Sequence, residues 1–245
     1  MITCKNLSFS YGERTLFTGL DFSLTPGVTI LLGPNGCGKT TLLKLLAGVL
    51  TPESGELLLD GTSLQKVSNR ERVGKIAVVP QFPPPALDFT VEELVQLGLH
   101  AGSGLFTAET VEDQRKINDI LKRLELERYR NTPCSRLSGG ELQRAAVAQA
   151  LVRATPVLLL DEPTASMDPA HAIRLMEILH DLPSTPYILV VSHDIFLSGR
   201  FADRAVLLAD GKIAADGTAD EVLTAVRLAE IYAIPEKYFS FFAKK

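Results

Sequence analysis

The sequence of 245 residues has no excess of positive charge, few cysteines and no long apolar run. Its formal net charge is −4, so no global basic field points to nucleic acid or to an anionic membrane surface. Cys4, Cys37 and Cys134 lie far apart and show no paired metal-ligand spacing. A disulfide framework or a zinc site is therefore not expected.

Membrane-spanning and secretory signals are also lacking. No apolar stretch approaches the roughly 20 residues that a spanning helix needs, and the start, MITCKNLSFSYGER, lacks the charged-then-apolar layout of a signal peptide. We therefore expect a cytosolic chain. With 46% hydrophobic residues it is long enough to bury a sizeable core, as one domain or one domain with two lobes.

Short apolar runs bounded by turn residues predict strands, several of them buried. These runs are Val28–Leu32, Glu56–Asp60, Lys75–Val79, Val157–Leu160, Tyr187–Val191 and Arg204–Leu208. Helical patterns lie between them, notably at Thr40–Leu50 and Leu142–Ala154. Because strands and helices alternate, we predict an α/β fold around a mostly parallel sheet.

One segment interrupts this alternation. From about Phe89 to Ala154 nothing has the pattern of a strand, whereas Val91–Leu99 and Ala108–Leu126 both have helical patterns. We interpret the segment as a helical lobe inserted into the sheet core. The preceding stretch QFPPP, residues 81–85, is a proline-stiffened connector that we expect to join the lobes.

A glycine-rich segment, GPNGCGKTT, follows the apolar run VTILL and opens the helical pattern TLLKLLAGV. This is the context that the phosphate-binding pattern G-x-x-x-x-G-K-[ST] requires. Backbone N–H groups and the helix N-terminus would face a β-phosphate, Lys39 would reach the β- and γ-phosphates, and the Thr40 hydroxyl would bind Mg²⁺. The alternative is a glycine-rich turn with a chance lysine. The predicted nucleotide-binding residues here are Gly33, Pro34, Asn35, Gly36, Cys37, Gly38, Lys39, Thr40 and Thr41.

Cys37 occupies a spacer position of this pattern. A passive small side chain is the favoured interpretation. The alternative is a reactive thiol, because a helix N-terminus favours the thiolate.

An acidic pair, Asp161-Glu162, follows the apolar run Val157–Leu160. Such a run is typical of a central parallel strand, whose carboxyl end lies at the same edge as the phosphate-binding loop. Asp161 would hold Mg²⁺, mainly through water, and Glu162 would polarise the water that attacks the γ-phosphate. The alternative is that the pair only begins a turn.

A second exposed helix start is predicted at Leu137-Ser138-Gly139-Gly140-Glu141, where Ser138 and Glu141 have capping-box spacing. An ordinary helix cap is the simpler interpretation. However, the glycine-rich loop already binds one nucleotide, so this helix start with its serine hydroxyl is a spare γ-phosphate site. A two-fold dimer would use it, since each chain could complete the other's site.

The combination of GPNGCGKTT, LSGGELQR and VLLLDEP resembles the ATP-binding cassette (ABC) ATPases, whose signature motif reads LSGG[QE]. The resemblance runs from about Ile2 to Gly217. It implies a P-loop NTPase core with a mostly parallel sheet, an N-terminal antiparallel β portion and an inserted helical lobe. Within a single domain, 1–245, residues 1–87 and 155–245 would form the core with its antiparallel portion, and 88–154 the lobe with the signature motif.

The resemblance also implies roles for further residues. Tyr11 would stack on the adenine, Gln81 would sense Mg²⁺ and the membrane partner, and His193 would contact the γ-phosphate. The alternatives are aromatic core packing for Tyr11, a polar turn for Gln81 and a structural histidine for His193. Asp168 matches the loop that crosses the dimer interface, and it could also cap the helix expected to start near Pro169.

These roles divide the candidate site into groups. The expected catalytic residues are Glu162, His193 and Lys39, and the expected metal ligands are Thr40, Gln81 and Asp161. The expected interface residues are Asp168 and Ser138. Besides the glycine-rich loop, the expected nucleotide-binding residues are Tyr11, Gln81, Ser138, Gly139 and Gly140. Departures from the family pattern are modest: Cys37 stands where serine is common, and Met167 where leucine is common.

The expected function is the ATP-binding subunit of a membrane transporter, with ATP and Mg²⁺ as cofactors. We expect a nucleotide-dependent homodimer at the cytoplasmic face of the membrane, integral membrane permease subunits as partners and an extracytoplasmic solute-binding protein in the complex. FTVEELVQLG and VEDQRKINDIL are similar to uptake ATPases for iron-siderophore, haem and cobalamin.

Other functions remain as alternatives. An exporter ATPase is one of them. A soluble cassette ATPase acting on nucleic acid or ribosomes is another, but such proteins usually carry long coiled coils or two cassettes, so no nucleic acid partner is expected. A nucleotide-binding module without hydrolysis conflicts with Glu162 and His193.

Overall fold

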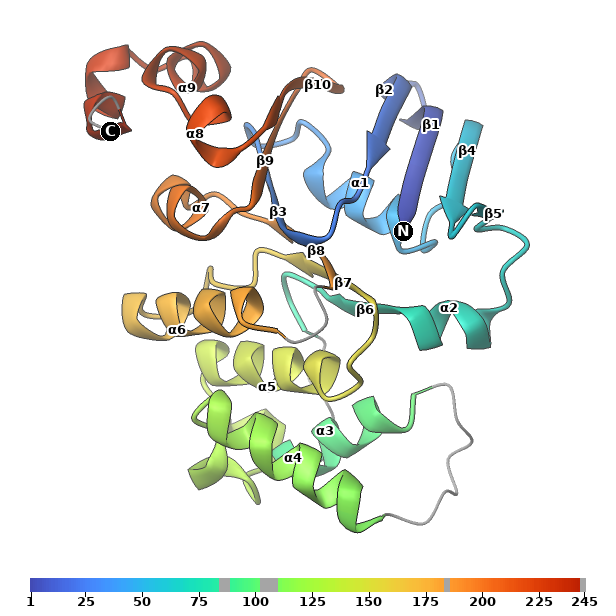
Figure 1. Cartoon of the computed structure of the whole chain (residues 1–245), viewed down its shortest axis with the longest axis vertical. Coiled ribbons are helices and arrows are strands. Elements are labelled where there is room, and N and C mark those ends of the chain that lie inside the picture. Colours follow the sequence, from blue (N-terminus) through green and yellow to red (C-terminus); the bar gives the residue numbers. More distant parts are fainter. Residues whose placement is uncertain (84–88, 102–109, 183–185, 243–245) are drawn as a thin grey trace. The chain divides into compact units, whose positions relative to one another are not determined.

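The computed structural model describes residues 1–83, 89–101, 110–182 and 186–242 (Figure 1). The chain forms two compact units, the first made of Met1–Val67 with Tyr187–Lys245 and the second of Ser68–Pro186. Among the residues that the structure describes, no helix combines the length and apolarity that crossing a bilayer requires.

The first unit begins with a small antiparallel sheet of strand order β2-β1-β4-β5. Its strands are β1 (Ile2–Tyr11), β2 (Arg14–Ser23), β4 (Ser54–Leu59) and β5 (Thr62–Ser63). Strand β1 pairs antiparallel with both β2 and β4. The expected antiparallel N-terminal portion is confirmed.

Strand β1 lies outside the apolar runs that predicted strands, for a local reason. Its buried side chains alternate at Ile2 and Cys4 and then at Leu7 and Phe9, with a register shift between the two pairs. Asn6, at φ 49°, lies at the shift. An extra residue of this kind reverses the phase of alternation, so the period of two is broken in the sequence.

The first unit also contains the parallel strands β3 (Gly27–Leu32), β8 (Tyr187–Val191) and β9 (Arg204–Ala209), with β3 between the other two. Strand β10 (Lys212–Gly217) adds to β9 in the antiparallel sense. Helix α1 (Lys39–Leu46) packs near β8, and α7 (Ile195–Phe201) near β3. The chain then forms α8 (Ala219–Val222), α9 (Ala225–Tyr232) and η3 (Glu236–Phe242). The predicted mostly parallel arrangement is confirmed for β3, β8 and β9.

Helix α1 is shorter than predicted at its C-terminal end. The apolar pattern continues to Leu50, but the helix ends at Leu46. The N–H groups of Val49 and Leu50 both bond back to the carbonyl of Lys44, closing the helix around Gly48. This is a glycine-containing C-terminal cap, which the leucine spacing concealed.

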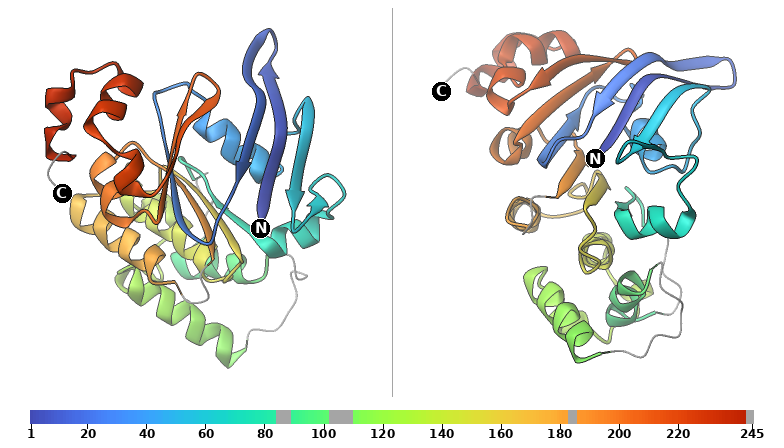
Figure 2. Two further views of the ribbon diagram at one scale, coloured as in Figure 1. Left: turned by 45° about the horizontal axis from the view of Figure 1, so that its top comes forward. Right: turned by 45° about the vertical axis from the view of Figure 1, so that its right-hand side comes forward.

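The second unit is a pair of parallel strands followed and preceded by helices. Strand β6 (Ile76–Val79) pairs with β7 (Val157–Asp161) in parallel. Along the chain, the helices α3, α4 and α5 come after β6 and before β7, and they pack on one another (Figure 2). The helices of this unit are α2 (Asn69–Lys75), α3 (Val91–Leu99), α4 (Val111–Arg123), η1 (Glu127–Tyr129), η2 (Cys134–Arg136), α5 (Gly139–Leu151) and α6 (Pro169–His180).

The inserted helical segment is confirmed. Helix α3 matches its predicted range. Helix α4 lies within the predicted segment 108–126, of which residues 108 and 109 lie outside the described residues, and it ends at Arg123. Capping boxes at Thr90 and Thr110 begin α3 and α4. Of the prolines at 83–85, only Pro83 belongs to the described part of the chain.

Candidate functional site

The glycine-rich loop runs from Gly33 to α1 in the first unit and requires glycine at its start. Gly33 has φ 152°, and a Cβ placed there would lie 2.0 Å from the carbonyl oxygen of Leu208. No other residue fits this position without moving the backbone of β9. The tip of the loop, Asn35 and Gly36, is exposed.

The lysine of the loop is folded back over it. Lys39 has only 6% of its surface exposed, and its Nζ donates to the carbonyl oxygens of Gly33 at 2.8 Å and Pro34 at 3.0 Å. The loop carbonyls thus hold a buried ammonium group where the sequence predicts phosphate. Thr40 and Thr41 follow in the first turn of α1, and Thr41 is buried.

Cys37 is part of the same loop, and its side chain is buried. Burial raises the pKa of its thiol, and the smaller opposing effect comes from the positive charge of Lys39. A thiol with a raised pKa is a weak nucleophile at neutral pH. The geometry therefore favours the passive interpretation.

The hairpin of β1 and β2 ends next to this loop. Arg14 donates through Nη2 to the carbonyl oxygen of Gly36 at 3.3 Å. Tyr11, with 51% of its surface exposed, stands edge-on to Phe9, with 4.9 Å between ring centroids. Tyr11 is therefore an exposed ring on the hairpin that touches the loop, which differs from aromatic core packing.

His193 follows the carboxyl end of β8 in the first unit. The register pairs Leu31 of β3 with Val191 of β8, and the Ser192 N–H donates to the Leu31 carbonyl at 3.2 Å. Because β3 leads directly into the glycine-rich loop, the parallel pairing brings His193 to the same sheet edge. The His193 side chain is exposed there.

The acidic pair ends β7 in the second unit. Asp161 is 4% exposed, whereas Glu162 is half-buried and has φ 48°. Gln81 leaves the neighbouring strand β6 at the same edge, since Val79 pairs with Leu160. The Gln81 side chain consequently donates through Nε2 to Oε2 of Glu162 at 2.8 Å.

The predicted capping box is present at the start of α5. The Glu141 N–H donates to Ser138 Oγ at 3.4 Å, and the Ser138 N–H donates to Glu141 Oε2 at 2.8 Å. Hydrogen bonds from the Tyr129 side chain and from the Ser138 backbone lower the pKa of Glu141 to about 2. A carboxylate thus stays ionised beside the helix N-terminus.

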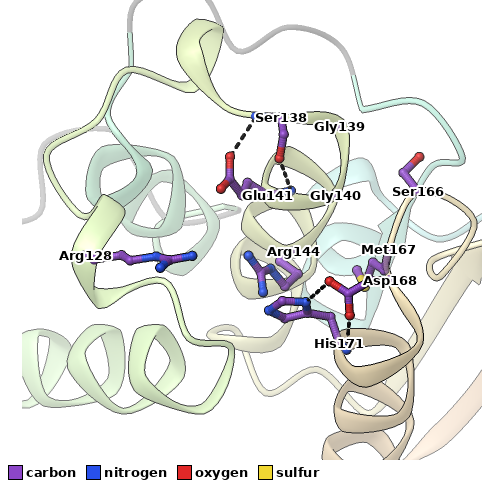
Figure 3. Close-up of a pocket in the computed structure, with 10 residues that line it drawn as sticks. All are labelled: Arg128, Ser138, Gly139, Gly140, Glu141, Arg144, Ser166, Met167, Asp168 and His171. Atoms are coloured by element: carbon purple, nitrogen blue, oxygen red, sulfur yellow. Dashed lines mark hydrogen bonds and ion pairs between the residues drawn. The ribbon is translucent and has the colours of Figure 1, made fainter.

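A pocket of about 400 Å³ opens between the start of α5 and the loop that precedes α6 (Figure 3). Gly140 makes the close approach possible, because a Cβ there would lie 2.6 Å from the carbonyl oxygen of Ser166. The pocket is lined by Arg128, Ser138, Gly139, Gly140, Glu141, Arg144, Ser166, Met167, Asp168 and His171.

Asp168 caps α6 on the far wall of this pocket, as the sequence allowed. Its Oδ1 accepts from the His171 N–H at 3.0 Å, and its Oδ2 contacts the His171 ring Nδ1 at 2.5 Å. Sequence reasoning missed His171. The available signal was the three-residue spacing from an expected helix cap, at which side chains of the first turn meet.

The candidate residues therefore fall into two sets. Gly33–Thr41, Tyr11 and His193 belong to the first unit, whereas Gln81, Ser138–Gly140, Asp161, Glu162 and Asp168 belong to the second. In the first set, strand register places His193 at the edge where the glycine-rich loop begins. In the second, Gln81 meets Glu162, and Ser138–Gly140 share a pocket with Asp168.

A family model described as "ABC transporter" matches residues 17–165, more than half of the chain. The chain belongs to the ABC transporter family. Over 236 residues it is 34% identical to the iron(3+)-hydroxamate import ATP-binding protein FhuC of Bacillus subtilis, covering 95% of the chain and 88% of that relative.

Two further relatives extend this result. The ferric enterobactin transport ATP-binding protein FepC of Escherichia coli is 35% identical over 233 residues, covering 94% of the chain and 86% of FepC. Among solved structures, a dimeric ATP-binding cassette in a post-hydrolysis state, bound to ADP and Pi, superposes with a TM-score of 0.78 at 28% identity. That match covers 89% of the chain and 99% of the cassette.

Proposed function

We propose that this chain is the ATP-hydrolysing subunit of a membrane transporter that imports a metal chelate or a similar small solute. The observation that carries hydrolysis is the Gln81–Glu162 hydrogen bond, which fixes the carboxylate of the proposed base at the edge of a parallel strand pair. The names of the relatives, an iron(3+)-hydroxamate import protein and a ferric enterobactin transport protein, support the import of chelated metal.

ATP binding is assigned to the loop Gly33–Thr41 and to Tyr11. A glycine without a Cβ at the loop start, a helix N-terminus and a lysine are what a phosphate chain requires. When phosphate arrives, Lys39 would exchange its bonds to the Gly33 and Pro34 carbonyls for bonds to phosphate oxygens. The exposed ring of Tyr11 is available to stack on the adenine.

Magnesium is assigned to Thr40, Gln81 and Asp161. Their hydroxyl, amide and carboxylate oxygens are the hard donors that Mg²⁺ takes together with phosphate and water. When bound, the ion would neutralise charge on the β- and γ-phosphates. The low exposure of Asp161 suits a carboxylate kept for this purpose.

Hydrolysis is assigned to Glu162, His193 and Lys39. Glu162 would orient the attacking water and take up its proton, and Gln81 would hold the carboxylate in the required rotamer. His193, exposed after β8, would hydrogen-bond the γ-phosphate, while Lys39 would stabilise the negative charge of the transferred group.

The working form is assigned as a homodimer, in which Ser138, Gly139 and Gly140 contact the γ-phosphate bound by the other copy and Asp168 lies at the interface. The dimeric cassette with ADP and Pi supports this arrangement. We place the dimer at the cytoplasmic face of the membrane, with permease subunits and an extracytoplasmic solute-binding protein as partners. An exporter is less consistent with the import relatives.

The test is the Glu162→Gln variant, which keeps the shape of the side chain but removes the base. We expect ATP turnover to fall by about 10²-fold or more, since general-base catalysis contributes about that much, while ATP binding persists and a dimer accumulates on a sizing column. The control is Glu112→Gln, which alters an exposed side chain in α4. Turnover of Glu162→Gln equal to wild type would overturn the proposed function.

A further inference from the structure

His171 contacts both carboxylate oxygens of Asp168. The His171 backbone N–H occupies Oδ1, and the ring Nδ1 occupies Oδ2 (Figure 3). These hydrogen bonds lower the pKa of Asp168, so the carboxylate is ionised and can only accept. Nδ1 therefore carries the proton.

The other ring nitrogen of His171 faces a second carboxylate. Nε2 lies 3.6 Å from Oε2 of Glu125, in the turn that follows α4. The imidazole thus stands between the loop before α6 and the helical segment around α4. About 28% of its side chain is exposed, so the ring is partly buried.

The loop from Glu162 to Asp168 is restrained along its whole length. Gln81 binds Glu162 at its start, and Ser166 packs against Gly140 in its middle. Two backbone hydrogen bonds close turns within the loop. The Ala165 N–H donates to the Glu162 carbonyl, and the Met167 N–H donates to the Thr164 carbonyl. The His171 ring is the side-chain restraint on its last residue, Asp168.

We propose that His171 is a positioning residue that pre-sets the Asp168 carboxylate for contact with the second copy of this chain. The inference rests on the proposed function, which places Asp168 at the dimer interface. With the ring bond in place, the carboxylate already has one rotamer before the two copies associate. Association therefore does not pay the entropy cost of ordering this side chain. Without it, the exposed carboxylate keeps its backbone cap but samples other orientations.

A purely structural role for His171 predicts something different. The backbone bond to Oδ1 does not depend on the side chain, so the helix cap survives substitution at this position. A structural ring would then affect unfolding of the monomer, whereas a positioning ring affects the ATP-driven dimer. Arg128, Arg144 and Glu141 line the same pocket and stay unchanged in every variant below.

The experiment measures dimer formation against ATP concentration on a sizing column, in the Glu162→Gln background. Asparagine places its side-chain N–H near the position of Nδ1, whereas glutamine places it near that of Nε2. We expect His171→Ala to raise the ATP concentration for half-maximal dimer by up to about tenfold, the cost of ordering one more side chain on association. His171→Asn should recover most of the loss, and His171→Gln should not.

Two comparisons complete the test. Adding Asp168→Ala should abolish the difference between His171 and His171→Ala, because the ring then has no carboxylate to hold. The control His180→Ala, at an exposed histidine on the same helix, should dimerise as the background does. ATP binding to the monomer and its thermal unfolding should stay close to the background values in all His171 variants.

The inference is overturned if His171→Ala dimerises at the same ATP concentration as the background. It is also overturned if glutamine restores dimerisation as well as asparagine, or if the loss follows monomer unfolding. A Glu162→Gln background that never dimerises with ATP would instead overturn the dimeric form in the proposed function, and this inference with it. That result would appear before any change at His171.

Discussion

The side-chain amide of Gln81 donates to the carboxylate of Glu162 at 2.8 Å, although the residues stand 81 positions apart in the chain. The parallel pairing of β6 with β7 produces this contact, because both strands leave the sheet at the same edge. A carboxylate that accepts a hydrogen bond from a neighbouring amide is fixed in orientation. The bond therefore predicts a coupling between Gln81 and the chemistry at Glu162.

The substitution Gln81→Glu tests this coupling, because it changes the donor into a second carboxylate of the same shape. Two carboxylates in hydrogen-bond contact cannot both ionise easily, so one pKa of the pair rises. We expect kcat at neutral pH to fall about tenfold or more, and the acidic limb of the pH–rate profile to move to higher pH. A steady-state ATPase assay across pH measures both.

The matched control is Gln65→Glu, which introduces the same charge at an exposed position. It should leave the pH–rate profile where the wild type has it. An unshifted acidic limb in Gln81→Glu would show that the two side chains do not interact in the working enzyme.

The sequence predicted the buried parallel strands well, since each is a continuous apolar run with turn residues on both sides. Strand β8 and helix α3 have their predicted ends. The pattern failed where backbone geometry broke the period, at Asn6 in β1, and where a glycine cap ended α1 before the leucines did. Neither the register shift nor the helix cap can be recognised from the spacing of apolar residues on which the prediction depended.

The candidate site divides in the same manner. Ser138 and Asp168 were predictable as caps, because the residues that complete each cap lie three positions away. The Gly140–Ser166 approach and the pairing of His171 with Glu125 join segments far apart in sequence. Such contacts depend on how the segments pack, and no local pattern encodes them.

The close approach of Gly140 to Ser166 predicts that alanine substitutions at Gly139 and Gly140 will have different effects on stability. At Gly140 a Cβ would lie 2.6 Å from the Ser166 carbonyl oxygen, whereas at Gly139 the nearest atom would be the Ser166 Cβ at 3.7 Å. We expect Gly140→Ala to destabilise the fold by about 1–3 kcal/mol through overpacking. Gly139→Ala should be neutral or slightly stabilising, since alanine favours helix.

Urea unfolding of both variants measures this contrast. Because both substitutions add the same methyl group to the first turn of α5, each controls for the other. Equal unfolding midpoints for the two variants would contradict the packing argument.

Glu141 predicts a dependence of stability on pH. Bonds from the Tyr129 side chain and the Ser138 backbone lower its pKa to about 2 in the folded chain, against about 4.3 in an unfolded one. Its contribution is therefore complete above the unfolded value and is lost as pH falls toward the folded one. Above about pH 5, Glu141→Gln should be less stable than wild type by about 1 kcal/mol, the usual value of a helix cap.

The measurement is the urea midpoint of both proteins at about pH 7, 5 and 3.5. The gap between them should narrow only at the lowest value, because the unfolded carboxylate takes up protons there while the folded one, with its pKa of about 2, stays ionised. Asp113, which caps α4 with Thr110, remains in both proteins, so its own titration cancels in the difference. A stability difference that stays constant down to the lowest pH would show that the capping hydrogen bonds do not lower the pKa of Glu141.

Lys39 predicts a separation of nucleotide binding from folding. Its ammonium is buried and bonded to the Gly33 and Pro34 carbonyls, so Lys39→Met preserves the packing of the stem but removes both bonds. We expect the variant to fold with a modest loss of Tm. In wild type, ATP at about 100 times its Kd should add about 2.7 kcal/mol of stability, whereas the variant should gain almost none.

Thermal unfolding with and without ATP measures this difference. The control is Lys44→Met, at an exposed lysine of the same helix, which should respond to ATP like wild type. Equal stabilisation of Lys39→Met and wild type by ATP would mean that Lys39 does not bind the phosphates.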